Sequence, residues 1–462
     1  MTTVDQLSIL QAENIALREQ VTALLAHQTS LQAQLEAALA HIAELEDRPK
    51  EPPAFVKANA PKREPKPPRR KRAPDHNRSR RLEAPTRVVE HALPHCPDCQ
   101  RRLRGQSIAR RRQVIELPEP APVTITEHHL LKRYCWHCRR WHTPRLDLQG
   151  QVLGQRRFGV RLTSLIAYLR TTLRLPIGQI RTYLATMHQL RLSAGAIVEL
   201  LHAAKQHGTD TLAALKAGIR ASSVVHGDET GWREGGQNGY IWSFSTPGAQ
   251  AIRFYTYDQS RSGQVARGVL GARFAGHLVT DFYAGYNQMP GPHQRCWAHL
   301  LRDLDKLTQQ HGQDVRVRRW AVQVEATYRL ARQRLRQEPA LTPVQRQAFY
   351  ARLVDRVTAL GRDYARAKKH PCQALAKRLL RHQDELFQFV VVEEVSADNN
   401  LAERSLRPLV VGRKISGGSR SADGSETRMG LASLFGTWSA RGLNPFEECL
   451  RLLSSKTPLP QL

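Results

Sequence analysis

Residues 222–230 read Ser-Ser-Val-Val-His-Gly-Asp-Glu-Thr, and residues 277–286 read His-Leu-Val-Thr-Asp-Phe-Tyr-Ala-Gly-Tyr. In each stretch a short apolar run typical of a buried strand ends at an acidic residue, Asp228 or Asp281. A third acidic residue, Glu403, lies in a helical pattern within Asp-Asn-Asn-Leu-Ala-Glu-Arg. Hard cations such as Mg²⁺ prefer carboxylate oxygen, so these three side chains could converge on a divalent metal pair.

Glu229 is the chief rival of Asp228 as a metal ligand, but adjacent side chains of a strand point to opposite faces of the sheet. The alternative for all three acids is ordinary: a helix cap, a turn residue and a surface helix residue.

The surrounding pattern predicts a mixed α+β core. Residues 240–244 and 252–257 alternate like strands, a short helix over 263–270 precedes the strand that ends at Asp281, and 293–297 favours a further strand. Three antiparallel strands, a helix and another strand suit a ribonuclease-H-like core. Residues 300–390 are rich in Arg and Leu and predict long helices that break around Pro339 and Pro371. We therefore expect a helical insertion between Asp281 and Glu403.

The chain carries a formal net charge of +29, from 70 basic and 41 acidic residues among 462. Such an excess favours a polyanionic partner, with a solvated basic surface as the alternative. No apolar run approaches the roughly 20 residues needed to span a bilayer, and we expect no secretion signal. Seven cysteines that include two CxxC pairs suit a reducing compartment and a metal site better than a disulfide framework.

The N-terminal region predicts a coiled coil followed by a basic linker. Over residues 7–45 one seam of the heptad pattern holds Leu7, Asn14, Val21, Gln28, Leu35 and Ile42, and the other holds Leu10, Leu17, Leu24, Leu31, Ala38 and Leu45. This favours a parallel homodimer, and packing on the same chain is the alternative. The Pro-rich linker concentrates basic residues that could track phosphates: Lys66, Arg69, Arg70, Lys71 and Arg72.

Two CxxC pairs predict one structural zinc held by Cys96, Cys99, Cys135 and Cys138. Residues 113–117 and 123–126 between the pairs are expected to form a hairpin that brings them together. A redox role for either pair is the alternative, and His95, His137 or His142 could substitute as a ligand. Next, residues 156–217 predict helices, with Pro176 opening one and Ser193 capping another. Residues 179–201 suit either a helix-turn-helix or ordinary helical packing.

Together these patterns predict a multidomain α+β protein. The expected parts are a coiled coil (1–46), a linker (47–85), a zinc-binding module (86–150), a helical DNA-binding segment (151–220), a catalytic core in two parts (221–299 and 393–440), a helical insertion (300–392) and a C-terminal tail (441–462).

The ordered motifs resemble the insertion-sequence-66 family of bacterial transposases over nearly the whole chain. The most specific stretches are Gly-Asp-Glu-Thr at 227–230, Asp-Phe-Tyr-Ala-Gly-Tyr at 281–286, Cys-Trp-Ala-His at 296–299 and the stretch at 398–404. The resemblance implies a DDE transposase of the bacterial cytoplasm, associated with the nucleoid. It implies a catalytic triad of Asp228, Asp281 and Glu403 on two Mg²⁺ or Mn²⁺ ions, which would cut DNA at the element ends and join the 3′-hydroxyl to target DNA. Accessory proteins encoded by the element are a further expected partner.

Secondary roles are expected for several neighbours of the triad. His299 and Asn400 could contact phosphate or orient a metal ligand, and Asn399 could cap the helix that carries Glu403. Arg404, Arg407, Arg413 and Lys414 are candidate DNA contacts, and the backbone amides of the Gly-rich 416–419 loop could approach an anion. Two alternative functions stay open: a metal-dependent nuclease that does not join strands, and a non-catalytic DNA-binding regulator.

Overall fold

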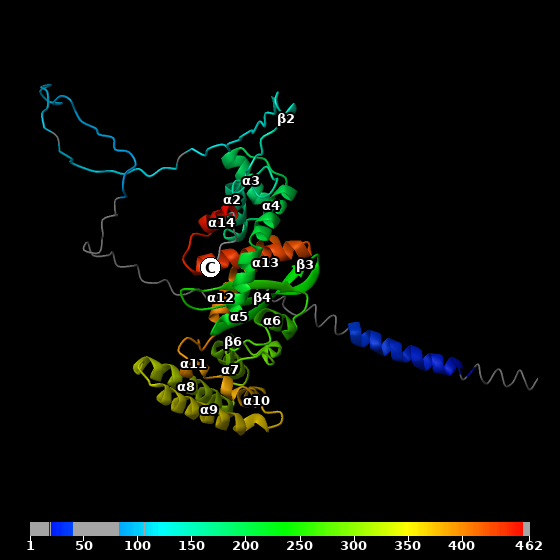
Figure 1. Cartoon of the computed structure of the whole chain (residues 1–462). Coiled ribbons are helices and arrows are strands. Elements are labelled where there is room, and N and C mark those ends of the chain that lie inside the picture. Colours follow the sequence, from blue (N-terminus) through cyan, green and yellow to red (C-terminus); the bar gives the residue numbers. More distant parts are fainter. Residues whose placement is uncertain (1–17, 19, 40–82, 106, 118, 456–462) are drawn as a thin grey trace, which may run out of the picture. The chain divides into compact units, whose positions relative to one another are not determined.

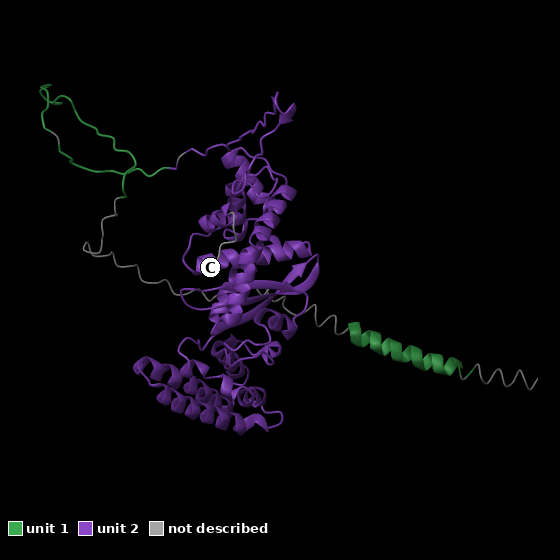
Figure 2. Cartoon of the chain, in the orientation of Figure 1, with its two compact units in different colours: residues 1–116 green, residues 117–462 purple. Residues whose placement is uncertain are grey.

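The computed structural model describes residue 18 and residues 20–39, 83–105, 107–117 and 119–455 (Figure 1). Most of the predicted heptad seam and linker lies outside the described residues, including Leu7, Asn14, Ile42 and all five basic linker residues. Described residues fall into two compact units, 1–116 and 117–462 (Figure 2). In the first unit, residues 20–39 form a helix, in which the seam residues Leu24, Leu31 and Leu35 are exposed.

The second unit opens with a small antiparallel hairpin of β1 (Arg133–Cys135) and β2 (Arg140–His142). The strands expected at 113–117 and 123–126 are wrong, because neither segment adopts strand structure. Val114, Ile115 and Leu117 are largely exposed instead. Alternating apolar residues favour a strand only where one face has a surface to pack against, and these residues have none among the described parts of the chain.

Four helices follow, as predicted for residues 156–217: α2 (Val160–Thr171), α3 (Ile177–His188), α4 (Ala194–His207) and α5 (Thr209–Ala221). Pro176 occupies the N-cap position of α3. The Ser193 hydroxyl accepts a hydrogen bond from the Ala196 amide at the start of α4. Both predicted helix starts are therefore confirmed, because they depend on short-range backbone chemistry.

A five-stranded mixed sheet forms the centre of the second unit, in the order β5-β4-β3-β6-β7. Its strands are β3 (Val224–Glu234), β4 (Gln237–Ser245), β5 (Arg253–Asp258), β6 (His277–Thr280) and β7 (His293–Arg295). Strands β3, β4 and β5 are antiparallel, whereas β6 and β7 run parallel to β3. The strand expected over 293–297 is shorter than predicted, because Trp297 begins a helix.

Helices cover both faces of this sheet (Figure 1). One face, through Trp232, Ile241 and Tyr255, packs against α12 (Asn400–Ser416) and α13 (Ala422–Ala440). On the opposite face Val225, Trp242 and Leu278 share a core with α6 (Gly263–Leu270) and with Tyr286 of the short helix η2 (Ala284–Tyr286). The C-terminal helix α14 (Pro445–Ser454) joins the core of α2 and α4.

Between β7 and α12 the chain forms a helical subassembly with its own hydrophobic core around Trp297 and Trp320. Its elements are α7 (Trp297–Gln310), α8 (Val315–Gln337), α9 (Pro343–Ala365), α10 (Gln373–Arg381), η3 (Gln383–Glu385) and α11 (Gln388–Val391). Breaks near Pro339 and Pro371 match the prediction. Val224 and Val279 of the sheet belong to the same core. In the described part of the chain, no helix combines the length and apolar character needed to cross a bilayer.

Candidate active site

The parallel pairing of β3 and β6 brings Asp228 and Asp281 to the same level of the sheet. His226 lies opposite Val279 in this register. Asp228 comes two residues after His226, and Asp281 comes two residues after Val279. Side chains two residues apart on a strand share a face. Asp228 therefore lies on the same face of the sheet as Val224, and Asp281 lies on the same face as Val279. Both valines pack against the helical subassembly.

Arg295 of β7 holds the backbone around Asp281. Its guanidinium is fully buried and donates hydrogen bonds to the Asp281 carbonyl oxygen at 3.0 Å and to the Asn287 side chain at 2.9 Å. Its charge is balanced by Glu385 of η3, at 2.5 Å. Burial opposes ionisation of Glu385, but the hydrogen bond from His382 and the charge of Arg295 hold its pKa at about 2. The loop after β6 is thus fixed by a buried charge pair.

Glu403 lies in the first turn of α12, and Asn399 connects the start of this helix to β3. The Asn399 amide group donates to the carbonyl oxygen of Gly227 at 2.8 Å, and its side-chain oxygen lies 3.1 Å from Nδ1 of His226. Asn399 occupies the N-cap position of α12, as predicted, but its side chain bonds to the sheet and makes no capping hydrogen bond. The Asp398 carboxylate accepts a hydrogen bond from the Asn400 amide at 3.1 Å.

Helix α7 supplies two basic side chains to the Glu403 carboxylate. Arg302 approaches Oε1 at 3.1 Å, and Nε2 of His299 lies 3.7 Å from the same oxygen. The Nδ1 atom of His299 is buried and has no hydrogen-bond partner among the described residues. His299 thus approaches Glu403. At Asn400 the hydrogen bonds found involve the backbone: its carbonyl accepts from the Arg404 side chain and its amide donates to Asp398.

The electrostatics of Asp228 show that the acidic residues act on one another. Burial, followed by the charges of Glu229 and Asp281, raises the pKa of Asp228 to about 8, and Glu403 adds a smaller contribution. In the part of the chain that the structure describes, the oxygens of Asp228, Asp281 and Glu403 do not all lie within 4.8 Å of one another.

Glu229 lies on the other side of β3 and its carboxylate already has partners. Arg261 donates to Oε1 at 2.7 Å, and the Tyr286 hydroxyl donates to Oε2 at 2.8 Å. Only 2% of the Glu229 side chain is exposed. Its role in the structure is to tie β3 to the segments around α6 and η2.

Comparison with known proteins places this geometry in a family. The profile described as Transposase IS66 family matches residues 155–427, more than half of the chain. The chain belongs to the IS66 transposase family. The matched region includes all of the sheet, the helical subassembly and α12, and it therefore contains Asp228, Asp281 and Glu403.

Two further proteins of Sinorhizobium fredii (strain NBRC 101917 / NGR234) resemble the IS66 chain described here. The uncharacterised protein y4jO is 32% identical over 161 residues, which are 33% of this chain and 46% of the relative. The uncharacterised protein y4jD is 30% identical over 231 residues, which are 45% of this chain and 43% of the relative. The chain thus spans less than half the length of each of these curated relatives.

The cysteine cluster lies outside the region matched by the IS66 profile. Ligand atoms of Cys135, Cys138 and His142 all lie within 4.8 Å of one another. The Cys138 amide donates to the Cys135 sulfur at 3.4 Å, and backbone hydrogen bonds, the largest from Cys138, lower the pKa of the Cys135 thiol. Cys96 and Cys99 belong to the first unit. There too, backbone hydrogen bonds from Cys99 and Asp98 lower the pKa of the Cys96 thiol.

The candidate DNA-contacting residues of the IS66 chain differ in their exposure and in their hydrogen bonds within the protein. Arg407 and Lys414 are exposed on α12, whereas the Arg413 guanidinium donates to the Gly231 carbonyl of β3. The Gly-rich loop is less available to an anion than expected, because the Gly417 and Ser419 amides donate to Arg413 and Arg233 carbonyls. A parallel bridge between Glu234 and Ser419 attaches this loop to the tip of β3.

Sequence reasoning missed Arg295 and the roles of Asn399 and His226. A signal for Arg295 was present, since an arginine inside a short strand that precedes a buried Cys-Trp pair has to find a buried partner. No local pattern identifies Asn399, because its partners are 172 residues away.

Proposed function

We propose that this IS66 family member is a DNA transposase in which Asp228, Asp281 and Glu403 form the catalytic triad. The observation that carries the proposal is the position of Asp228, a carboxyl level with Asp281 on the sheet, whose pKa is raised by burial first and then by the charges of Glu229, Asp281 and Glu403. Three acids from β3, the end of β6 and α12 are brought to one face by the sheet register and by Asn399. Strongly perturbed acids that gather from distant segments are typical of catalytic sites.

The fold supports the same proposal. The strand order β5-β4-β3-β6-β7, with three antiparallel strands followed by two parallel ones, supports a ribonuclease-H-like core. The helices between β7 and α12 would then be the insertion that separates the second acid from the third.

The donor set fits divalent metal ions. Three carboxylates offer the oxygen ligands that Mg²⁺ or Mn²⁺ prefers, and cations would offset the burial and the neighbouring negative charges that raise the Asp228 pKa. When bound, such ions supply charge stabilisation for the attacking and leaving oxygens of a phosphodiester. The chain's own part is to hold the ligands: Arg295 fixes the Asp281 backbone, Asn399 fixes α12 against β3, and Arg302 and His299 restrain the Glu403 carboxylate.

Further parts of the proposal rest on charge and on cysteine chemistry. We propose that double-stranded DNA, at the element ends and at the target, contacts Arg404, Arg407, Lys414 and the linker residues, because basic side chains neutralise phosphates. One Zn²⁺ would be held by Cys96, Cys99, Cys135 and Cys138, with His142 as the rival ligand. The protein would act in the bacterial cytoplasm, at the nucleoid, as at least a dimer.

The decisive experiment measures cleavage and strand transfer on labelled element-end DNA with Mg²⁺ or Mn²⁺. Asp228→Asn, Asp281→Asn and Glu403→Gln should each lower cleavage by about 10³-fold or more, because each removes an anionic ligand and keeps the side chain's size. Asp305→Asn, an exposed acid on α7, is the matched control and should retain full activity. DNA binding at fixed salt should persist in all four variants.

Three outcomes would contradict the proposal in different ways. Full cleavage by the Glu403→Gln protein would remove Glu403 from the triad and favour Asp398. Cleavage without joining would favour a nuclease. Binding without any cleavage in the unmodified protein would favour a DNA-binding regulator.

A further inference from the structure

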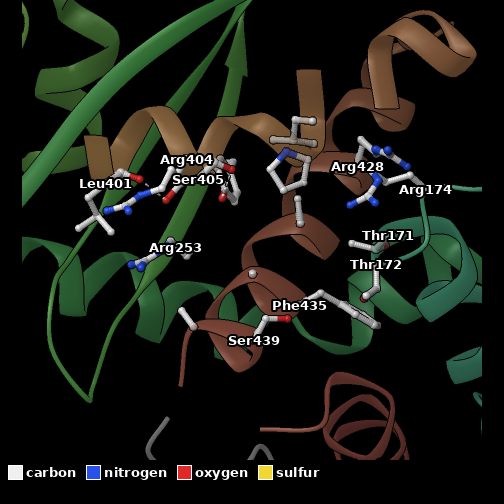
Figure 3. A pocket seen from close by; sticks show the side chains of 16 residues that line it. Thr171, Thr172, Arg174, Arg253, Leu401, Arg404, Ser405, Arg428, Phe435 and Ser439 are labelled. Atoms are coloured by element: carbon white, nitrogen blue, oxygen red, sulfur yellow. Dashed lines mark hydrogen bonds between the residues drawn. The ribbon is translucent and has the colours of Figure 1, made fainter. Parts of the chain in front are cut away.

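A cavity of about 500 Å³ lies between the end of α2, strand β5 and helices α12 and α13 (Figure 3). Four arginines from four separate segments line it, and we call this cavity the arginine pocket: Arg174, Arg253, Arg404 and Arg428. Figure 3 shows Arg253 and Arg404 on one side of the cavity and Arg174 and Arg428 on the other. Four positive side chains in one cavity require an explanation, because like charges repel.

No carboxylate compensates these arginines. Among the described residues, none of the four has an acidic oxygen within 4.0 Å. Their hydrogen bonds within the protein go to backbone carbonyls: Arg253 to Thr246 and Ile252, Arg404 to Asn400, and Arg428 to Arg170. These bonds use only some of the N–H groups of each guanidinium, and the others have no acceptor among the described residues.

Arg428 is the most informative of the four. Only 8% of this residue is exposed. Burial, followed by the charges of Arg170 and Arg174, lowers its pKa to about 9. Keeping a charged guanidinium buried is costly unless an anion pairs with it. Arg428 thus offers a buried positive charge that no carboxylate among the described residues pairs with.

The other residues that line the arginine pocket favour a ligand larger than a small inorganic anion. Apolar side chains face the same cavity, including Tyr255, Leu409 and Phe435. The buried hydroxyls of Thr171 and Thr172 also line it and have no hydrogen-bond partner among the described residues. Cavities of several hundred cubic ångströms with apolar walls and a few convergent polar groups are typical of sites for organic ligands. A ligand with a phosphate and an apolar ring system matches both parts of the wall.

The pocket lies beside the candidate catalytic residues. Arg404 directly follows Glu403 on α12, and it is exposed at the rim together with Pro408 and Ser439. The pocket and the Glu403 carboxylate therefore share helix α12.

We infer that the arginine pocket holds one nucleotide of a DNA strand, with its phosphate against the arginines and its base against the apolar wall. The inference rests on the transposase function proposed above and adds a site for a nucleotide beside the site of cleavage. Guanidinium groups donate paired hydrogen bonds to phosphate oxygens, and packing of a base against an apolar or aromatic surface stabilises its binding. The pocket would position the strand and takes no part in bond cleavage.

The test measures binding of a labelled single-stranded oligothymidylate to the full-length protein in EDTA, as a function of salt. Arg428→Gln and Arg253→Gln should each weaken binding about tenfold, and each lost phosphate contact should reduce the salt slope by about 0.7. Arg319→Gln, an exposed arginine on α8, is the matched control and should bind normally. Unchanged affinity and slope in the folded Arg428→Gln and Arg253→Gln proteins would overturn the inference.

Folding and ligand identity are controlled separately. Arg404→Gln tests the exposed rim, so it keeps the inference falsifiable if the buried Arg428→Gln variant fails to fold. Thymidine monophosphate should compete with the oligonucleotide at a lower concentration than inorganic phosphate does. Equal competition would overturn the assignment to a nucleotide. Oligonucleotide binding in EDTA does not require cleavage, so retained cleavage by the Asp228→Asn protein would contradict the catalytic proposal without affecting the pocket.

Discussion

The side-chain amide of Asn399 donates a 2.8 Å hydrogen bond to the carbonyl oxygen of Gly227, the residue directly before Asp228. Asn399 itself is fully buried and immediately precedes α12, four residues before Glu403. Its side-chain oxygen meets His226, which burial keeps neutral by lowering its pKa to about 4. One side chain thus sets the distance between the strand of the first acid and the helix of the third.

Asn399→Ala should therefore reduce cleavage roughly 10–100-fold, the usual range for residues that orient metal ligands. The Mg²⁺ concentration needed for half-maximal cleavage should rise, because the ligands are no longer held together. Leaving the Gly227 carbonyl unpaired should also cost about 1–3 kcal/mol of unfolding free energy. Asn238→Ala, in the exposed hairpin, serves as the control. A loss of stability with an unchanged Mg²⁺ requirement would show that Asn399 has no positioning role.

Glu229→Gln should retain cleavage within about tenfold of the unmodified protein, because its carboxylate contacts Arg261 and Tyr286 on the other side of β3. The variant should lose about 1 kcal/mol of stability, a modest value because Arg261 is half exposed. Cleavage assays and chemical denaturation measure the two effects. A loss of cleavage as large as that of Asp228→Asn would make Glu229 a metal ligand.

The pKa of Asp228 predicts a pH-dependent stability. Its folded value of about 8 lies above its ordinary value of 3.8, so between these values the folded protein holds a proton that the unfolded chain releases. Stability should therefore fall as the pH rises through this window. In EDTA at pH 8, Asp228→Asn should be more stable than the unmodified protein by about 1 kcal/mol or more.

Thermal unfolding of both proteins from pH 5 to pH 8 measures this gap, which is the difference in stability between Asp228→Asn and the unmodified protein. Added Mg²⁺ should narrow it, since a bound cation stabilises only the protein that keeps its carboxylate. The same gap at every pH would mean that Asp228 does not titrate in this window.

Elemental analysis of the full-length protein should find about one zinc per chain, as expected for a closed structural site. Cys135→Ser and Cys138→Ser should each lose the metal. His142→Ala discriminates between ligand sets, because its ligand atom lies with those of both cysteines. Zinc retained by His142→Ala and lost by Cys96→Ser supports four thiolates, and the reverse pattern makes His142 a ligand. Absence of zinc from protein prepared without chelators would contradict both sets.

Deleting residues 7–45 should lower the mass measured by light scattering to that of a single chain. The physical reason is the apolar seam, of which Leu24, Leu31 and Leu35 are exposed in the described helix. Oligomers that survive the deletion would show that assembly depends on another surface.

Local patterns in the amino-acid sequence were enough to predict most elements of the core. The strand before Asp281, the helix starts at Pro176 and Ser193, and the helices that break near Pro339 all follow from short-range backbone and periodicity rules. The strand expected to end at Asp228 is longer than predicted, because β3 continues through Asp228 to Glu234 by pairing with β4. Family membership followed from the ordered motifs, and the IS66 match confirms it. Residues 113–117 show the limit of such patterns, because their alternation predicted a strand that has no surface to pack on.

What depended on the three-dimensional arrangement is the set of contacts between segments far apart in the chain. The Asn399 contact with Gly227, the Arg295 pair with Glu385 and the convergence of four arginines on one cavity join residues 90 to about 250 positions apart. A side chain's propensity is set by its neighbours in sequence, whereas its hydrogen-bond partners and the cost of its buried charge are set by its neighbours in space. Sequence patterns therefore identified the acids, and tertiary packing determined how they are held and what lies beside them.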